Sequence, residues 1–207
     1  MGLFDLASQL PGDFILASGS PRRVELVREM GIEARVCPQN VDETPLPDEG
    51  AVELVTRLAK LKAASAEKDA RPGDVILAAD TTVAIDNVEL GKPRDAAEAT
   101  RMLHELSGRT HEVSTGVCLV LVGSEVSPSR TVSFSETTKV EFYELSDDDI
   151  AAYVASGEPL DKAGAYGIQG QGRALVRGIH GDYFNVVGLP VAATMRELAG
   201  LLGDNQA

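Results

Sequence analysis

The chain has 207 residues, of which 43% are hydrophobic and 25% charged, and this is enough to bury the core of a globular domain. It carries 19 basic and 32 acidic residues, a net charge of −13, and only 4% of its residues are aromatic. This balance disfavours proteins that bind duplex DNA or a membrane through a basic face, and aromatic platforms for single-stranded nucleic acid. A small anion stays compatible if basic side chains converge on it or a divalent cation offsets its charge.

Cysteine usage and hydropathy predict a cytoplasmic protein. Cys37 and Cys118 form neither a disulfide framework nor a metal-binding knuckle. No apolar run reaches the roughly 18 residues of a membrane helix, and the N-terminus lacks the features of a secretory signal.

Helix and strand patterns alternate after residues 1–12, which we expect to form a loosely attached tail. In chain order, the patterns predict a strand at 14–17, a helix at 21–30, a strand at 34–37, a helix at 50–68, a strand at 74–85, a helix at 95–106, strands at 112–122 and 131–143, a helix at 146–157, strands at 174–179 and 183–187, and a helix at 190–202. No linker or composition shift divides the chain, so residues 1–207 are predicted to form one domain.

The alternation predicts a three-layer α/β (mixed α+β) fold, in which a mixed, twisted sheet carries helices on both faces. The long neighbouring strands between residues 112 and 143 predict an antiparallel part within that sheet.

The first helix places an arginine on its core-facing side. Ser20 as N-cap and Pro21 at the first helical position predict where the helix begins. At about 100° per residue, Arg23 falls on the apolar stripe of this helix, close to the positive end of the helix dipole. With Ser18 in the preceding turn, this pattern is typical of a phosphate cradle. Solvated arginines paired with nearby acids are an equally good interpretation.

The second helix also directs one basic residue inward. Lys60 projects away from the apolar face, whereas Lys62 lies within it, between Val55 and Leu58. Lys62 either binds a ligand or extends past the edge of the core to solvent.

Asp80 ends the apolar run 75–79, and ligands in open α/β sheets gather at the carboxyl ends of strands. The position suits a metal ligand or a general base, and a turn-forming aspartate is the ordinary alternative.

The glycine-rich stretch around residues 164–172 does not match the dinucleotide-binding pattern, and the chain lacks P-loop and serine-hydrolase motifs. Its glycines predict tight turns or a loop whose backbone approaches a ligand.

Taken together, these segments resemble the Maf nucleotide pyrophosphatases, and most closely the branch that acts on dTTP and UTP. The matching segments are 16–23 (LASGSPRR), 58–63 (LAKLKA), 79–81 (ADT), 91–93 (GKP), 106–108 (LSG), 161–170 (DKAGAYGIQG) and 181–190 (GDYFNVVGLP). They keep the family order from residue 14 to about 195.

The resemblance implies a fold like that of Maf and ITPase proteins and hydrolysis of a nucleoside triphosphate to the monophosphate and pyrophosphate. It places the catalytic base at Asp80, which with Glu43 would bind a divalent metal. Mg²⁺ is expected first, with Mn²⁺ and Co²⁺ as alternatives. The implied substrate-binding and specificity residues are Ser18, Arg22, Arg23, Lys62, Thr81, Lys92 and Gln169.

The same resemblance implies a nucleotide as partner and a homodimer, whereas the charge balance predicts neither a nucleic acid polymer nor a membrane as partner. Two other functions stay open. One is a pyrophosphatase for non-canonical purine nucleotides on a similar fold, which a substrate panel would distinguish. The other is a non-catalytic regulator of cell division or septum formation, for which the sequence shows no obvious protein-binding surface.

Overall fold

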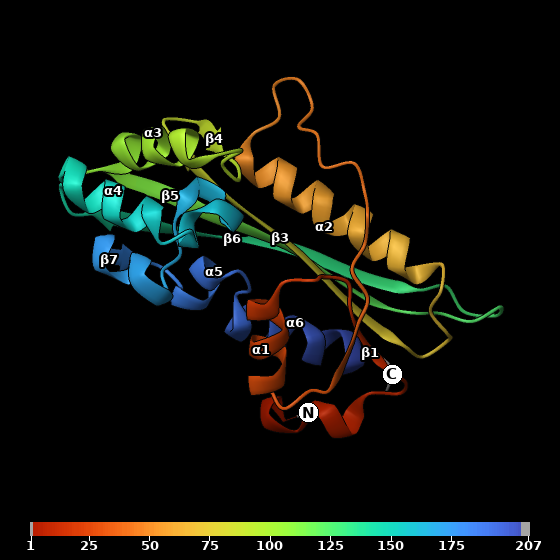
Figure 1. Ribbon diagram of the computed structural model, residues 1–207. Coiled ribbons are helices and arrows are strands. Elements are labelled where there is room, and N and C mark those ends of the chain that lie inside the picture. The colour runs from red at the N-terminus through yellow and green to blue at the C-terminus, as the bar shows by residue number, and fades with distance from the viewer. Residues whose placement is uncertain (1, 204–207) are drawn as a thin grey trace.

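The computed structural model describes residues 2–203, whose strands form one seven-stranded sheet with helices packed against it (Figure 1). The strands are β1 (Phe14–Leu16), β2 (Ala34–Val36), β3 (Val75–Ile85), β4 (Val88–Leu90), β5 (Thr110–Leu121), β6 (Arg130–Phe142) and β7 (Val176–His180). The helices are α1 (Pro21–Glu29), α2 (Ala51–Glu67), α3 (Ala96–Leu106), α4 (Asp147–Ala155), α5 (Tyr183–Val187) and α6 (Val191–Gly203). Short 3₁₀ turns include η1 (Leu3–Asp5), η2 (Ala7–Gln9), η3 (Glu158–Asp161), η4 (Ala163–Ala165) and η5 (Gly170–Leu175).

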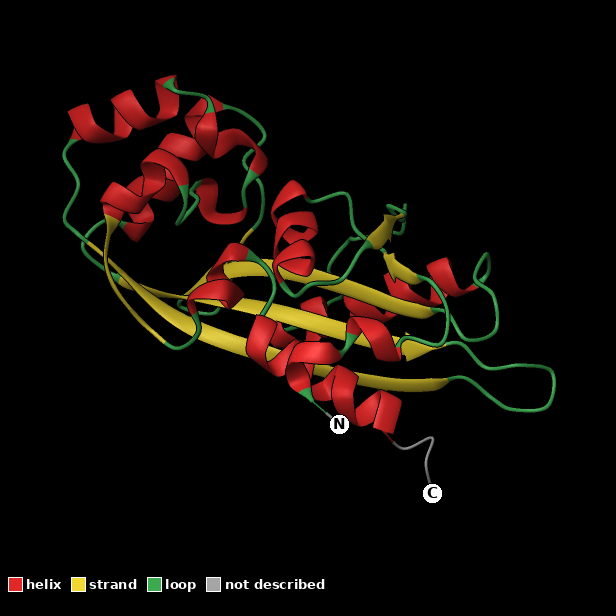
Figure 2. Ribbon diagram, turned by 90° about the horizontal axis from the view of Figure 1, so that it is seen from below, coloured by secondary structure: helices red, strands yellow, loops and turns green. Residues whose placement is uncertain are grey.

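The sheet is mixed, as predicted. Its strand order is β2-β1-β3-β5-β6-β7, with β4 paired to the far end of β3. The pairs β1–β2 and β1–β3 are parallel, whereas β3–β5, β5–β6 and β6–β7 are antiparallel. The sheet therefore combines four short strands (β1, β2, β4 and β7) with three long ones (β3, β5 and β6), which run well past the end of β1 (Figure 2).

Helices cover both faces of the sheet, which confirms the predicted layers. On one face Ala59 of α2 belongs to the same hydrophobic cluster as Ile76 of β3, and on the other Leu26 of α1 and Leu198 of α6 belong to the same cluster as Leu77. Ile76 and Leu77 reach opposite faces because side chains alternate along a strand. A further core lies at the other end of the sheet, beneath α3 and α4 (Figure 1).

The N-terminal segment differs from the expected loose tail. Met1 lies outside the described residues, but Leu6 is only 2% exposed and packs in the core that contains Leu198 of α6. The backbone N–H of Asp13 donates to the carboxylate of Asp74, at 3.0 Å. An apolar side chain that finds a place in the core holds this segment against the domain.

The prediction of a strand at 183–187 is wrong, because these residues form α5. The run of aromatic and β-branched residues favours a strand by composition. Asp182 instead caps a helical turn by accepting a hydrogen bond from the N–H of Phe184, at 2.8 Å. The turn directs the fully buried Asn185 inward, where its amide donates to Val113 O and Thr138 Oγ1.

Asp80 lies inside β3, as the predicted strand at 74–85 has it, and not at the carboxyl end of a strand, which corrects that part of the sequence-based interpretation. β3 continues through Asp80 to Ile85. The strand that ends is its neighbour β1, whose last paired residue, Leu16, lies opposite Leu77.

Candidate active site

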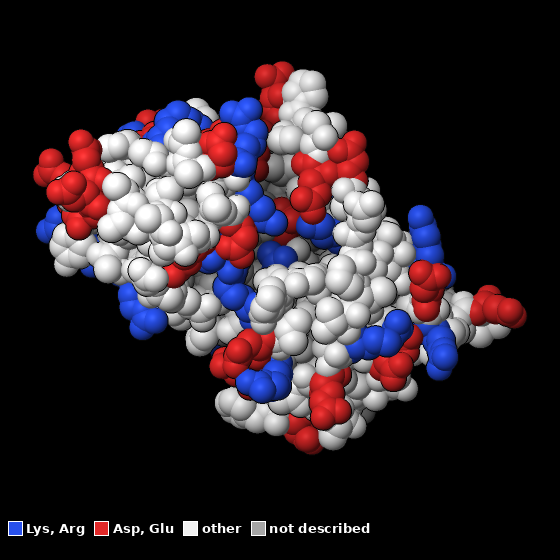
Figure 3. Space-filling view, viewed as in Figure 1, with Lys and Arg blue, Asp and Glu red and all other residues white. Residues whose placement is uncertain are grey.

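An open stretch of the β3 edge forms the floor of a large pocket. On this edge β1 stops pairing opposite Leu77 and β4 starts pairing opposite Val83. The side chains between them alternate between the two faces of the sheet, yet Asp80, Thr81 and Thr82 line the same pocket because no strand separates the faces there. The cavity has a volume of about 1050 Å³, enough for a nucleotide. Lys and Arg side chains occupy the hollow that is visible in Figure 3.

Lys62 connects two carboxylates above this floor. Its Nζ lies 2.5 Å from Oδ1 of Asp80 and 2.6 Å from Oε1 of Glu43, which comes from the loop before α2. The residue is only 8% exposed, as its place on the apolar face of α2 predicts, whereas Lys60 is exposed. The structure therefore brings together Lys62, Asp80 and Glu43 from three separate segments.

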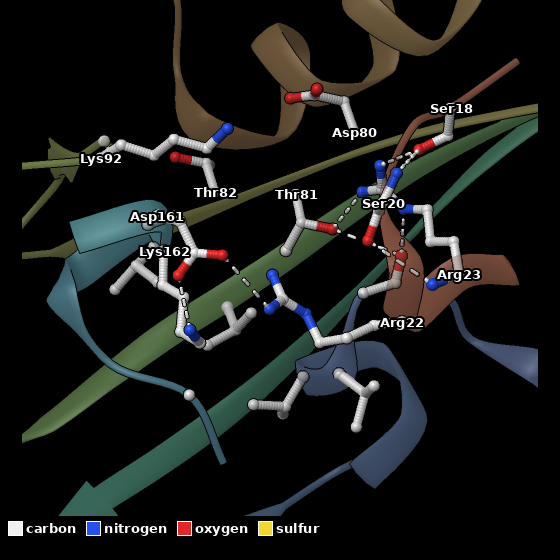
Figure 4. A pocket seen from close by; sticks show the side chains of 18 of the residues that line it. Ser18, Ser20, Arg22, Arg23, Asp80, Thr81, Thr82, Lys92, Asp161 and Lys162 are labelled. Atoms are coloured by element: carbon white, nitrogen blue, oxygen red, sulfur yellow. Dashed lines mark hydrogen bonds and ion pairs between the residues drawn. The ribbon is translucent and has the colours of Figure 1, made fainter. Parts of the chain in front are cut away.

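Arg23 is fixed by the protein on several sides. Its Nε donates to Gly188 O at 2.8 Å, and its terminal nitrogens donate to Ser18 Oγ at 3.2 Å and to Thr81 Oγ1 at 2.9 Å (Figure 4). Burial lowers the pKa of Arg23, and the nearby Asp80 carboxylate opposes that shift. An arginine is so basic that it stays charged, so these contacts hold a positive charge in one orientation.

A buried hydroxyl chain supports this arginine from below. Thr81 Oγ1 lies 2.8 Å from Thr115 Oγ1, and the Thr115 hydroxyl donates to the backbone oxygen of Asn185, at 3.1 Å. Thr115 and Asn185 are both fully buried. Sequence analysis did not identify this pair, since an apolar strand gives no sign of which of its hydroxyls lies beneath a site.

The remaining predicted residues lie around the mouth of the pocket. Arg22 is less constrained than Arg23, and its closest carboxylate, that of Asp161, lies 4.0 Å away (Figure 4). Lys92 is exposed and makes no ion pair with any of residues 2–203, and Gln169 is exposed in the loop between η4 and η5. All nine site residues that the resemblance implies line this one pocket: Ser18, Arg22, Arg23, Glu43, Lys62, Asp80, Thr81, Lys92 and Gln169.

Other charged residues join the lining. Lys162 binds Asp161 Oδ1 and Glu158 O within its own loop, and Thr82 donates to Glu89 at 2.7 Å. The lining therefore has five Lys or Arg residues and five Asp or Glu residues: Arg22, Arg23, Lys62, Lys92 and Lys162, against Glu43, Asp80, Glu89, Glu158 and Asp161. These formal charges cancel, so a polyanion gains little net attraction from the lining alone.

The carboxylates of the pocket suit a metal ion that binds together with a phosphate group better than a metal ion bound by protein ligands alone. Among residues 2–203, no group of three or more His, Cys, Asp or Glu side chains is arranged to hold an ion. Glu43 and Asp80 nevertheless converge on one cationic centre, the ammonium of Lys62. Mg²⁺ is commonly bound by one or two carboxylates, with water and substrate phosphates as its other ligands.

The described residues include no helix that is both long and apolar enough to cross a bilayer.

Comparisons with known proteins identify the family. The family model described as Maf-like protein matches residues 13–201. A dTTP/UTP pyrophosphatase of Bacillus cytotoxicus is 49% identical over 185 residues, which are 89% of this chain and 93% of that protein. A dTTP/UTP pyrophosphatase of Bacillus cereus is 47% identical over 184 residues, with the same shares covered. The solved structure of the Staphylococcus aureus Ham1 protein matches 63% of this chain and 72% of its own, with 15% identity and a TM-score of 0.38. The family model and the two pyrophosphatases match nearly the whole chain, which shows that this protein belongs to the Maf family.

Proposed function

We propose that this protein is a nucleotide pyrophosphatase that hydrolyses dTTP and UTP to the monophosphate and pyrophosphate. The observation that carries the proposal is the placement of Asp80 in a nucleotide-sized pocket, 2.5 Å from Lys62 and close to the fixed charge of Arg23. A carboxylate next to cations suits the attack of water on a phosphate group, because the cations stabilise the negative charge of the transition state.

In the proposed reaction, water attacks the α-phosphorus and passes a proton to Asp80. The new bond joins the water oxygen to phosphorus, the bond to the bridging α–β oxygen breaks, and pyrophosphate leaves. Arg22, Arg23 and Lys92 contact phosphate oxygens, with arginine able to bind two oxygens at once. Lys62 orients Asp80 through its 2.5 Å contact.

A divalent cation, with Mg²⁺ proposed first, would be held by Glu43 and Asp80. When bound, it neutralises phosphate charge and makes the attacking water more acidic. The balance of five basic and five acidic side chains in the lining supports this requirement.

The preference for pyrimidines rests on the relatives named dTTP/UTP pyrophosphatase and on the Gln169 side chain at the pocket. A carboxamide can both donate and accept hydrogen bonds, which matches the imide edge of uracil and thymine. A cytoplasmic location, expected from cysteine usage and hydropathy, and a homodimer, implied by the family resemblance, belong to the same proposal.

Hydrolysis in ¹⁸O-labelled water tests the reaction and the substrate together. With dTTP, UTP, CTP, dATP and ITP as substrates, we expect pyrophosphate and monophosphate in equal amounts, fastest with dTTP and UTP, and the label in the monophosphate. Label in pyrophosphate, release of orthophosphate, or a preference for ITP would contradict the proposal.

A further inference from the structure

The loop that carries Gln169 is built around the carboxylate of Glu158. Oε2 of Glu158 accepts the backbone N–H of Gln171 at 2.9 Å, and Oε1 accepts that of Gly172 at 3.1 Å. The hydroxyl of Tyr153, from α4, donates to the same Oε1 at 3.0 Å. The Glu158 carboxylate, at the start of η3, thus takes the place of backbone acceptors for the N–H groups of the turn that follows Gln169.

Tyr153 extends this contact to the other side of Gln169. Its hydroxyl oxygen also accepts the backbone N–H of Gly167, at 3.2 Å, and the residue is only 5% exposed. The turn from Gly167 to Gly172 is therefore anchored on both sides of Gln169 by two adjoining side chains.

The turn contains glycines because Glu158 and Tyr153 lie very close to its backbone. Gly170 has a φ of +66°, and a Cβ there would lie 2.6 Å from Oε2 of Glu158. A Cβ on Gly172 would lie 2.4 Å from the backbone oxygen of Gly167 and 2.6 Å from the Tyr153 hydroxyl. Glycine is needed at both positions because a larger residue would displace the Glu158 carboxylate at one and would clash with the turn's own backbone and the Tyr153 phenol at the other.

The charge of Glu158 suits this role. Burial alone would raise its pKa, but the N–H groups of Gln171 and Gly172 stabilise the carboxylate, and the pKa is lowered overall. An ionised carboxylate only accepts hydrogen bonds, so it satisfies all three donors without competition.

We infer that Glu158 is a positioning residue for base selection, which acts through the Gly167–Gly172 turn to aim Gln169 at the base edge of the nucleotide. The inference rests on the proposed function, in which Gln169 reads the imide edge. Glu158 lines the same pocket as Gln169, but its carboxylate oxygens are committed to the loop.

A double-mutant cycle tests this inference. UTP and CTP differ at the base edge that Gln169 is proposed to read, so the ratio of their kcat/KM values reports selection. We expect E158Q to reduce that ratio about tenfold, mainly through a higher KM for UTP, because an amide nitrogen replaces one acceptor. In a Q169A background, E158Q should change the ratio less than twofold. Independent, additive effects of the two substitutions would overturn the inference.

Two variants complete the experiment. E125Q makes the same chemical change on an exposed residue outside the pocket lining and should leave the ratio unchanged. Y153F keeps the aromatic ring but removes a donor to Glu158 and an acceptor for Gly167, so it should shift the ratio in the same direction as E158Q. It also provides the test if E158Q does not fold.

Amide hydrogen exchange without nucleotide separates this inference from the proposed function. The N–H groups of Gln171 and Gly172 should exchange at least tenfold faster in E158Q than in wild type or E125Q. Unchanged exchange would overturn the inference whatever the activity. A wild-type protein that is inactive on every nucleotide would refute the proposed function, and exchange alone would then show whether Glu158 holds the turn.

Discussion

Arg22 and Arg23 are neighbours in sequence but have different tasks in the fold. Arg23 donates to Gly188 O, Ser18 Oγ and Thr81 Oγ1, whereas the closest carboxylate to Arg22 is 4.0 Å away. Arg23 is therefore part of the framework of the pocket, and Arg22 is free to follow a ligand.

Alanine at each position should separate these tasks. We expect Arg23→Ala to lower the free energy of unfolding by about 1–3 kcal/mol, since it leaves buried acceptors without a donor. Arg22→Ala should change it by less than about 0.5 kcal/mol while raising KM for the nucleotide. Urea unfolding and steady-state kinetics measure both effects. Equal losses of stability in the two variants would contradict this division.

His111 offers a test by pH. It is 1% exposed, its Nε2 lies 2.8 Å from the hydroxyl of Tyr166, and burial lowers its pKa to about 4. In the unfolded chain the pKa returns to about 6.5, so the unfolded state binds more protons between these values. Stability should therefore be full above pH 6.5 and fall as the pH drops toward 4, by roughly 3 kcal/mol for this group.

His111→Phe removes the titration and keeps a ring beside Phe142. It should be less stable than wild type at pH 8, because Tyr166 loses its partner, and this deficit should shrink as the pH falls to 4.5. Thermal melting over this range measures the difference. A deficit that stays constant with pH would show that His111 does not titrate as described.

At the scale of elements, the close approach of α2 to the sheet creates the Lys62–Asp80 contact. Gly116 of β5 lies directly opposite Asp80 in the ladder, and a Cβ on it would lie only 2.3 Å from the backbone oxygen of Val55 in α2. A side chain at this position would clash with the backbone of α2, which cannot move aside as the end of a flexible side chain can.

We expect Gly116→Ala to lower the free energy of unfolding by about 1–3 kcal/mol and to reduce activity as α2 shifts away from Asp80. Gly200→Ala is the matched control, because nothing lies within 4 Å of a Cβ there and the residue is inside α6. It should stabilise the protein by up to about 1 kcal/mol. Urea unfolding of both variants measures these changes. An unchanged free energy of unfolding in Gly116→Ala would contradict the packing described.

The sequence predicted well those helices that begin with a cap formed by residues close to the helix end. Ser20 accepts the N–H of Arg23 at the start of α1, and Ser146 and Asp149 form a reciprocal cap on α4. The prediction of a strand at 183–187 was wrong because Asn185 of α5 binds Val113 and Thr138, which are far from it in the sequence and leave no local signal. The short strand β4 (Val88–Leu90) was not among the predicted elements.

The site could be predicted only in part, for a related reason. Helical periodicity identified Arg23 and Lys62 as inward-facing, but the open edge that exposes Asp80 arises from where β1 and β4 stop pairing with β3. Glu43 reaches Lys62 along an irregular loop, and Glu158 carries no pattern that separates it from a surface glutamate. The family resemblance supplied the assignment of Glu43.

At the scale of the whole molecule, an acidic protein has to bind a polyanion. The chain carries a net charge of −13, and the pocket lining adds no net positive charge of its own. The fixed orientation of Arg23 helps locally, but long-range forces oppose binding unless a cation accompanies the nucleotide.

Glu43→Gln should therefore have opposite effects with and without metal. With α,β-methylene-UTP and EDTA, affinity should rise a few-fold, since a negative charge is lost. With Mg²⁺, affinity should fall about tenfold, since a metal ligand is lost. Isothermal titration calorimetry measures both, with Asp42→Asn as a control from the same loop that does not line the pocket. A change in the same direction in both conditions would rule out Glu43 as a ligand.

The most direct test of the whole account is the rate of pyrophosphate release from dTTP and UTP, with Mg²⁺, by wild type and Asp80→Asn. The substitution keeps the shape of the side chain and leaves Glu43 as a partner for Lys62, so the thermal melting curve should change little. We predict that kcat falls by about 10²- to 10⁴-fold. Turnover near that of wild type in the folded variant would contradict the assignment of this pocket as the place where Asp80 activates water.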